Sequence, residues 1–196
     1  MMNYNKLSKL NDKLYFTAED ISELLGIKYN SALVMCTRYV KNGSFIRLKN
    51  NFYILTQTWK ELSQEKLFKT ANILQVPSYI SLNTALSYYG VTTQVQRDYF
   101  ESISLKRQTE REIAGKTFNY YKIAGTFYTD FVKQNDIFIA SKEKAFIDAV
   151  YLYSFGKYRI DFNALDYKKL DISRIKKIIN RYSDKTKRIM KKLCKI

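Results

Sequence analysis

The chain has 196 residues, 46% of them hydrophobic and 15% aromatic, and it carries a formal net charge of +16. Such a chain can bury a core, either as one domain of ordinary size or as two small ones. It contains no histidine, which excludes Ser-His-Asp, Cys-His and HExxH chemistry. There is no run of about 18 apolar residues and no apolar signal-peptide segment, and Cys36 and Cys194 have no metal-binding spacing. We therefore expect a reduced, cytoplasmic protein with no metal and no cofactor.

The positive charge is concentrated at the two ends of the chain. Residues 1–60 hold nine Lys/Arg against four Asp/Glu, residues 61–156 hold eleven against ten, and residues 157–196 hold fourteen against four. A general compositional bias toward lysine would also fill the middle of the chain, which is nearly neutral. Clustered basic charge is typical of nucleic-acid-binding proteins, so the sequence predicts a nucleic-acid partner and no membrane partner.

Two short helices joined by a turn are predicted near the N-terminus. Thr17 and Asp20 occupy the two positions of a capping box, and Gly26 can end the first helix in a left-handed conformation. Asn30 or Ser31 can cap the second helix. Its expected buried residues are Ala32, Leu33, Cys36, Tyr39 and Val40.

A β-hairpin is expected directly after the second helix. The runs FIRL (45–48) and FYIL (52–55) are rich in strand formers, and Asn50-Asn51 between them tolerates positive φ. Helix-turn-helix followed by a hairpin is the pattern of a winged helix, which we predict over residues 1–58.

In a winged helix the second helix enters the major groove of DNA, and residues near its start contact base edges. Neighbouring basic and polar residues hold phosphates or reach the minor groove. The candidate DNA-binding residues are Lys28, Tyr29, Asn30, Ser31, Val34, Thr37, Arg38, Lys41, Arg47, Lys49, Asn50 and Asn51. Winged helices also serve as protein–protein modules, and this alternative stays open.

After the hairpin, the sequence predicts a helix over residues 57–76. Residues 59–76 of this helix connect the winged helix to a second domain, residues 77–196. Pro77 bars this helix from continuing. The second domain is expected to be mixed α/β, with a small sheet and a basic helical tail, which makes the chain α+β. We expect strands at 99–106, 117–123 and 136–140, and helices that start at Ser81 or Asn83, at Ser141, at Asp171 and at Thr186.

The stretch IASKEKAFIDAVYL, residues 139–152, holds Ser141, Glu143, Lys144 and Asp148. One reading is a catalytic centre that acts on nucleic acid. The other is a helix that Ser141 caps, with an exposed ion pair between Lys144 and Asp148 on a face that contacts a partner. No nucleophile–base pair or metal spacing accompanies these residues, which favours a non-enzymatic role. The side expected to pack on the sheet holds Ala145, Phe146, Ala149, Val150 and Tyr153.

Together with PSYISLNTALSYYG, residues 77–90, this stretch resembles the AbiEi antitoxin family of bacterial abortive-infection toxin–antitoxin systems. The matching residues are Tyr79, Ile80, Ser81, Leu82, Ala85, Leu86, Tyr88 and Gly90 in the first block, and Ala140, Ser141, Glu143, Lys144, Ala145 and Asp148 in the second. Lys142 replaces a proline of the family pattern, and Phe146-Ile147 replaces two leucines. The resemblance covers roughly residues 15–185.

This resemblance implies an N-terminal winged helix that binds double-stranded DNA at inverted repeats in its own promoter and represses the operon. It further implies a C-terminal antitoxin domain that counteracts a cognate AbiEii-type nucleotidyltransferase toxin without a tight complex. The motif residues of that domain are Ser81, Tyr88, Ser141, Glu143, Lys144 and Asp148. Two alternatives stay open: a stand-alone winged-helix transcription factor and a nucleic-acid-modifying enzyme.

Overall fold

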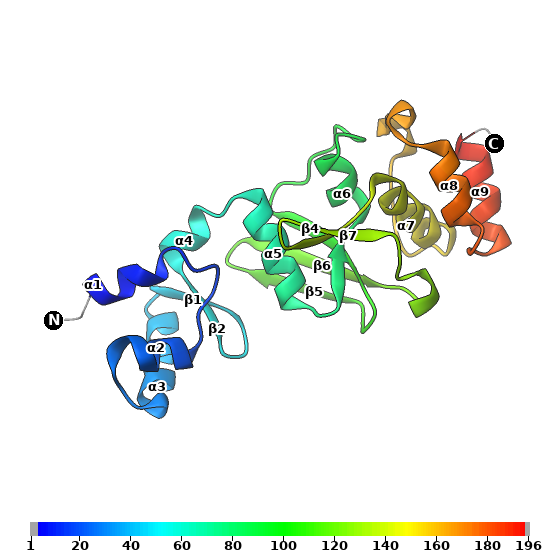
Figure 1. The fold of residues 1–196 in the computed structure, drawn as a ribbon. Helices are drawn as coiled ribbons and strands as arrows, with labels where there is room; N and C mark the ends of the chain where they lie inside the picture. The colour runs from blue at the N-terminus through cyan, green and yellow to red at the C-terminus, as the bar shows by residue number, and fades with distance from the viewer. Residues whose placement is uncertain (1–3, 195–196) are drawn as a thin grey trace. The chain divides into compact units, whose positions relative to one another are not determined.

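The computed structural model describes residues 4–194, and the chain divides into two compact units, Met1–Thr70 and Ala71–Ile196. Its architecture is α+β, as predicted, with one two-stranded sheet and one six-stranded mixed sheet (Figure 1). The division between the units lies inside the segment 59–76 that was expected to connect two domains. Across residues 4–194, no helix combines the length and the hydropathy that crossing a membrane requires.

The first unit packs short helices against an antiparallel hairpin. Its elements are α1 (Tyr4–Leu7), the 3-10 helix η1 (Ser8–Leu10), α2 (Ala18–Leu25), α3 (Tyr29–Lys41), β1 (Phe45–Lys49), β2 (Phe52–Leu55) and α4 (Thr56–Lys60). Its core joins Ile21 of α2, Cys36 of α3 and Phe45 of β1. Cys36 is therefore a core residue, and burial raises the pKa of its thiol to about 11.

The predicted start and end of α2 are confirmed. The Thr17 N–H donates to Asp20 Oδ2 at 2.7 Å, and the Asp20 N–H donates back to Thr17 Oγ1 at 3.3 Å. Gly26 follows the helix with φ 66°. Glycine adopts this left-handed conformation at little cost because it has no Cβ. The expected cap of α3 is wrong: the helix begins at Tyr29, with Lys28 as N-cap and no side-chain capping bond.

The single connecting helix predicted over residues 57–76 is also wrong. The chain forms α4 and then α5 (Gln64–Leu74), separated by residues 61–63. Ser63 Oγ accepts the Lys66 N–H at 3.3 Å, which favours a new helix start over continuation of the old one. The sole tryptophan of the chain, Trp59, lies in α4 and is 2% exposed.

The second unit is built around the six-stranded sheet, whose strand order is β5-β6-β4-β3-β8-β7. Pairs β4–β6 and β3–β8 are parallel, and the other neighbouring pairs are antiparallel. The strands are β3 (Ser78–Ile80), β4 (Tyr99–Ser104), β5 (Thr109–Ile113), β6 (Lys116–Lys122), β7 (Phe131–Gln134) and β8 (Ile137–Ala140). The helices are α6 (Leu82–Tyr88), α7 (Lys142–Ser154), α8 (Ile172–Ile179) and α9 (Asp184–Cys194), with 3-10 turns η2 (Gly125–Phe127), η3 (Phe162–Ala164) and η4 (Tyr167–Lys169).

Three strands of this sheet were predicted at 99–106, 117–123 and 136–140, and β4, β6 and β8 lie there. Residues 100–104 of β4 are all buried. Consecutive strand residues point to opposite faces, so both faces of β4 are covered. The edge strands β5 and β7 were missed because their exposed, charged sequences, TEREI and FVKQ, do not show a buried face.

Helix α7 is buried over most of its circumference. Ser141 caps it, as predicted, by accepting the Lys144 N–H at 3.2 Å. Tyr153 was expected to pack on the sheet, but it is 43% exposed. Helices α8 and α9 lie side by side next to α7 in Figure 1. Asp171 caps α8 as predicted, whereas α9 begins at Asp184, two residues before the expected start.

A candidate nucleic-acid interface and a buried polar network

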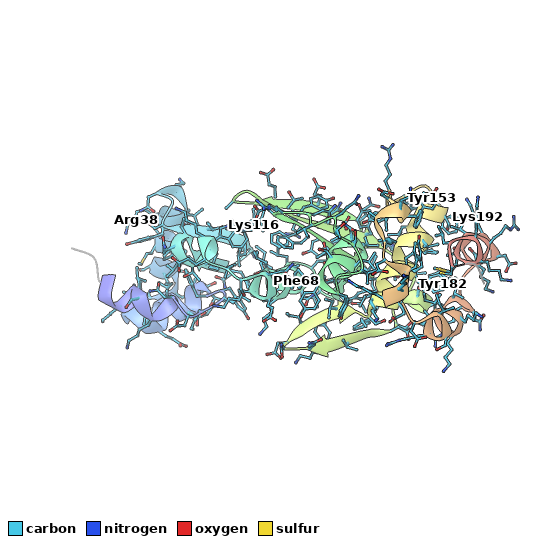
Figure 2. All side chains as sticks on the ribbon, turned by 90° about the horizontal axis from the view of Figure 1, so that it is seen from above. Arg38, Phe68, Lys116, Tyr153, Tyr182 and Lys192 are labelled. Atoms are coloured by element: carbon cyan, nitrogen blue, oxygen red, sulfur yellow. The ribbon has the colours of Figure 1, made fainter. Side chains whose placement is uncertain are left out.

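The outer face of α3 carries several of the residues that were predicted to contact DNA. Asn30, Ser31, Val34, Arg38 and Lys41 are exposed and recur at helical spacings of three and four, so they share one face. Figure 2 labels Arg38 on this helix. Val34 is 67% exposed although it is apolar. An exposed valine between polar residues is suited to apolar contact with a thymine methyl group.

Four polar side chains on this face make no hydrogen bond within the part of the chain that the structure describes. These are Asn30, Ser31, Arg38 and Lys41, and their donors and acceptors are open to an external partner. Thr37 is different, because its hydroxyl donates to the Leu33 carbonyl at 3.0 Å. The structure therefore separates polar groups available for recognition from one that bonds to its own helix.

The start of α3 lies close to a carboxylate from α2. Glu19 and Tyr29 interact through their side chains, and hydrogen bonding from Asn51, with a smaller contribution from Tyr29, lowers the pKa of Glu19. Lys28 is exposed beside this pair. A carboxylate at this position repels phosphate, so the positive potential of the α3 face comes from its later turns, where Arg38 and Lys41 lie.

The hairpin turn divides its predicted DNA contacts into two groups. Arg47 and Asn50 are exposed and bond to each other, with Nη2 to Oδ1 at 2.8 Å, and the Lys49 ammonium lies 4.1 Å from the Phe52 ring centroid. Asn51, with φ 57°, accepts the Ala18 N–H at 3.0 Å and donates to Glu19 Oε2 at 2.7 Å. The Asn51 amide therefore ties the hairpin to the start of α2 and is already occupied.

In the second unit, the two motif blocks meet in a buried polar network. Lys144 and Asp148 are both 0% exposed and form an ion pair one turn apart on α7. Asp148 Oδ2 also accepts hydrogen bonds from Tyr79 Oη at 2.9 Å and from Ser81 Oγ at 2.8 Å. Lys144 Nζ donates to Tyr182 Oη at 2.9 Å. The network joins β3, the start of α6, α7 and the segment before α9.

This arrangement contradicts the predicted exposed ion pair and the predicted partner-binding face. The residues around the pair exclude water, and burial raises the pKa of the Asp148 carboxyl although Lys144 opposes this shift. Each charged atom has protein partners, as a buried ion pair requires. Because Lys144 and Asp148 have no exposed surface, a substrate has no direct access to them.

Glu143, the third charged motif residue, is buried as well and bonds to the segment that leads into α8. Its Oε1 accepts the Asp171 N–H at 3.1 Å, and its carboxylate lies 3.9 Å from both Lys142 Nζ and Arg174 Nη1. Glu143 therefore positions α8 against α7.

Tyr88, the remaining motif residue, lies at the end of α6. It is partly exposed, and its ring contacts the ring of Tyr89.

A second buried carboxylate, which the sequence did not single out, lies on β4. Glu101 Oε2 accepts hydrogen bonds from Tyr158 Oη at 2.9 Å and from the Asn83 N–H at 3.1 Å. Its own N–H donates to Thr84 Oγ1 at 2.9 Å. Burial raises the pKa of Glu101 to about 7. These bonds fix the first turn of α6 on the sheet.

Sequence reasoning also missed Tyr79 and Tyr182 as members of the network. The signal for Tyr79 was present, since it stands two residues before Ser81 in a strand and so faces the same side. No local pattern identifies Tyr182, which reaches Lys144 from 38 residues away. Within residues 4–194, no group of three His, Cys, Asp or Glu side chains is placed to hold a metal ion.

Comparisons with protein-family models, with curated proteins and with solved structures return no match to this chain.

Proposed function

We propose that this chain is a sequence-specific DNA-binding repressor whose first unit is a winged helix. The observation that carries the proposal is the exposed face of α3, where Asn30, Ser31 and Arg38 have no partner among the described residues. Asparagine pairs with adenine, and arginine pairs with guanine, through two hydrogen bonds each. The tripartite order of α2, α3 and the β1–β2 hairpin agrees with this fold.

Helix α2, helix α3 and the hairpin of the first unit each have a role in this proposal. Helix α3 enters the major groove, and the exposed hairpin residues Arg47 and Asn50 contact the backbone or the minor groove. Asn51 holds the hairpin against α2 and so sets the angle of the wing. By analogy with the AbiEi pattern, the DNA site is a pair of inverted repeats in the promoter of the chain's own operon.

For the second unit we propose the antitoxin role that the sequence resemblance implies, directed against an AbiEii-type nucleotidyltransferase toxin. The contact between the two motif blocks gives a physical reason for their joint occurrence, because Ser81 and Asp148 complete one network. The motif then maintains the fold, and contact with the toxin pathway falls to exposed residues outside it. A stand-alone transcription factor with the same architecture is the second candidate.

We also propose that the protein is not an enzyme. Glu143, Lys144 and Asp148 were the only catalytic candidates in the sequence, and each is at least 99% buried and bonded within the fold. A general acid or base must come within hydrogen-bond reach of a substrate, which this burial prevents.

The proposal is tested by selecting duplexes from a random-sequence pool with the full chain. We expect enrichment of an inverted repeat and a preference for it over scrambled duplex. A pool that stays random after selection would overturn sequence-specific binding. Co-expression of the chain with a neighbouring nucleotidyltransferase gene separates the two candidates, since only an antitoxin restores growth.

A further inference from the structure

Helices α8 and α9 use their apolar sides to complete the second unit and leave a basic outer surface. Ile175, Ile178 and Met190 are buried, and the segment between the helices contributes buried Tyr182. Residues 172–194 hold nine Lys/Arg against a single acidic residue, Asp184. The fold therefore brings a strong positive charge to one small surface.

Several of these cations already have partners. Arg174 lies 3.9 Å from Glu143, Arg181 lies 3.5 Å from Asp130, and Lys185 lies 5.3 Å from the Phe155 ring centroid. In contrast, Lys176 and Lys191 have no ion-pair partner among residues 4–194. Lys187 Nζ lies 3.7 Å from Asp184 Oδ1, but the Asp184 side chain is itself 92% exposed.

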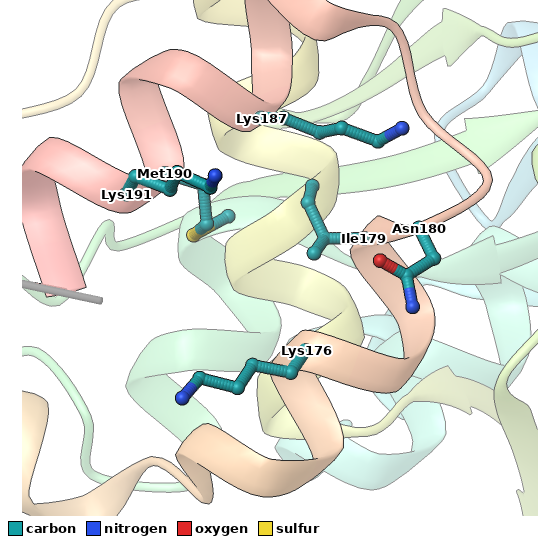
Figure 3. A pocket seen from close by; sticks show the side chains of 6 residues that line it. All are labelled: Lys176, Ile179, Asn180, Lys187, Met190 and Lys191. Carbon is teal, nitrogen blue, oxygen red and sulfur yellow. The ribbon is translucent and has the colours of Figure 1, made fainter.

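Three of these nine cations line a hollow between the two helices. Its volume is about 400 Å³, and it is lined by Lys176, Ile179 and Asn180 of the α8 side and by Lys187, Met190 and Lys191 of α9. Figure 3 shows Lys176 on one helix and Lys187 and Lys191 on the other, with Ile179 and Met190 between them. Three lysines and one amide around Ile179 and Met190 give the hollow a positive charge, which suits a phosphate group.

We propose that this hollow is a second DNA contact, which binds the phosphate backbone of duplex DNA without regard to sequence. Lysine acts as a point charge toward phosphate and carries little base information. Neither α8 nor α9 contains an aromatic residue, so these two helices themselves offer no platform on which the unpaired bases of a single strand could stack. This absence favours a duplex over a single strand.

A lipid surface fits the same charges less well. Helices that lie in a membrane interface insert exposed apolar side chains. The apolar residues Ile175, Ile178 and Met190 are buried in the fold instead. The inference adds a site to the proposed DNA binding, and it stands apart from the question of which α3 residues read bases.

The test uses the full chain and two triple variants that remove the same charge. One is Lys176→Gln/Lys187→Gln/Lys191→Gln, at the hollow. The control is Lys106→Gln/Lys122→Gln/Lys157→Gln, at exposed positions elsewhere in the second unit. Fluorescence anisotropy measures the affinity of each for a random-sequence duplex, for the same sequence as a single strand and for anionic phosphatidylglycerol vesicles, over a range of salt. Circular dichroism verifies that both variants are folded.

We expect the hollow variant to bind random duplex several-fold more weakly than the control. Its plot of log K against log salt should be shallower by about 0.9 for each phosphate that the variant no longer neutralises. Equal affinities and slopes for the two variants would overturn the proposal, as would a loss confined to single strands or to vesicles. This comparison uses random-sequence duplex, so it can be made even if the chain has no preferred sequence. Failure of the phosphate contact at the hollow is therefore distinguishable from failure of base recognition by α3.

Discussion

The ion pair between Lys144 and Asp148 illustrates how a residue pattern can be right in spacing and wrong in environment. Spacing of four on a helix correctly brings the two side chains together. Exposure depends on what packs around α7, and the sequence of α7 alone contains no information on Tyr79 or Tyr182. Removal of one partner from a buried pair lowers stability much more than the same change in an exposed pair.

Breaking this pair should therefore destabilise the second unit strongly. We expect Asp148→Asn to lower its free energy of unfolding by about 3–5 kcal/mol, because Lys144 is left as an unpaired buried charge. The double variant Lys144→Met/Asp148→Leu should recover much of that loss. Urea titration followed by circular dichroism measures these changes, while Trp59 fluorescence reports the first unit as an internal control. A loss below about 1 kcal/mol, as for exposed pairs, would contradict the burial of the network.

Glu101 makes the stability of the second unit depend on pH. Its folded-state pKa of about 7 lies above its ordinary value of 4.5, so the folded state retains a proton that the unfolded state releases. The resulting stabilisation is fully present below about pH 4.5 and is lost as the pH rises through about 7. Between about pH 5 and pH 7 the decrease should be about 2 kcal/mol larger in the wild type than in Glu101→Gln.

Urea titrations at the two pH values measure this difference. Tyr158→Phe serves as a comparison, because it removes the hydroxyl that stabilises the charged form of Glu101. That variant should retain the pH dependence or increase it. Parallel pH profiles for the wild type and Glu101→Gln would contradict the raised pKa of Glu101.

At the scale of elements, local sequence signals located those boundaries that local chemistry determines. The capping box of Thr17, the left-handed Gly26, the Ser141 cap and the Asp171 cap all depend on residues within a few positions of each other. The local cap that Ser63 provides at the start of α5 was overlooked, and the edge strands β5 and β7, which depend on pairing with distant strands, were missed. The exposed α3 face was predictable because helical spacing fixes it, whereas the occupied state of Asn51 was not.

Asn51 should act through stability rather than through DNA contact. Asn51→Gly keeps the positive φ without strain but removes the acceptor of the Ala18 N–H. We expect the free energy of unfolding of the first unit, followed by Trp59 fluorescence in urea, to fall by about 1 kcal/mol. Direct contact of Asn51 with bases would instead appear as a weakened sequence preference at unchanged stability.

Arg38 should act through DNA contact rather than through stability. Arg38→Ala is expected to reduce the preference for the selected duplex over scrambled duplex by roughly 1–3 kcal/mol at unchanged stability. Lys60→Ala, which removes an exposed cation from α4 of the same unit, is the matched control. Competition binding measures both variants, and equal preferences for the two would remove Arg38 from base recognition.

At the scale of the whole molecule, the uneven charge of the sequence corresponds to two separate basic surfaces. One lies on α3 and the hairpin of the first unit, and the other lies on α8 and α9 of the second. The nearly neutral middle of the sequence forms the six-stranded sheet and α7, where charged residues such as Glu101 and Lys144 are buried. The distribution of charge along the chain could be predicted from the sequence, whereas the hollow between α8 and α9 is visible only in the structure.

A salt-dependent competition titration tests whether the α3 face recognises a DNA sequence. The full chain is titrated against its selected duplex and a scrambled duplex at low and at high salt. We predict tighter binding to the selected duplex at both salts, with log K falling linearly with log salt. Equal affinity for the two duplexes, or binding that does not respond to salt, would contradict sequence-specific DNA binding by this chain.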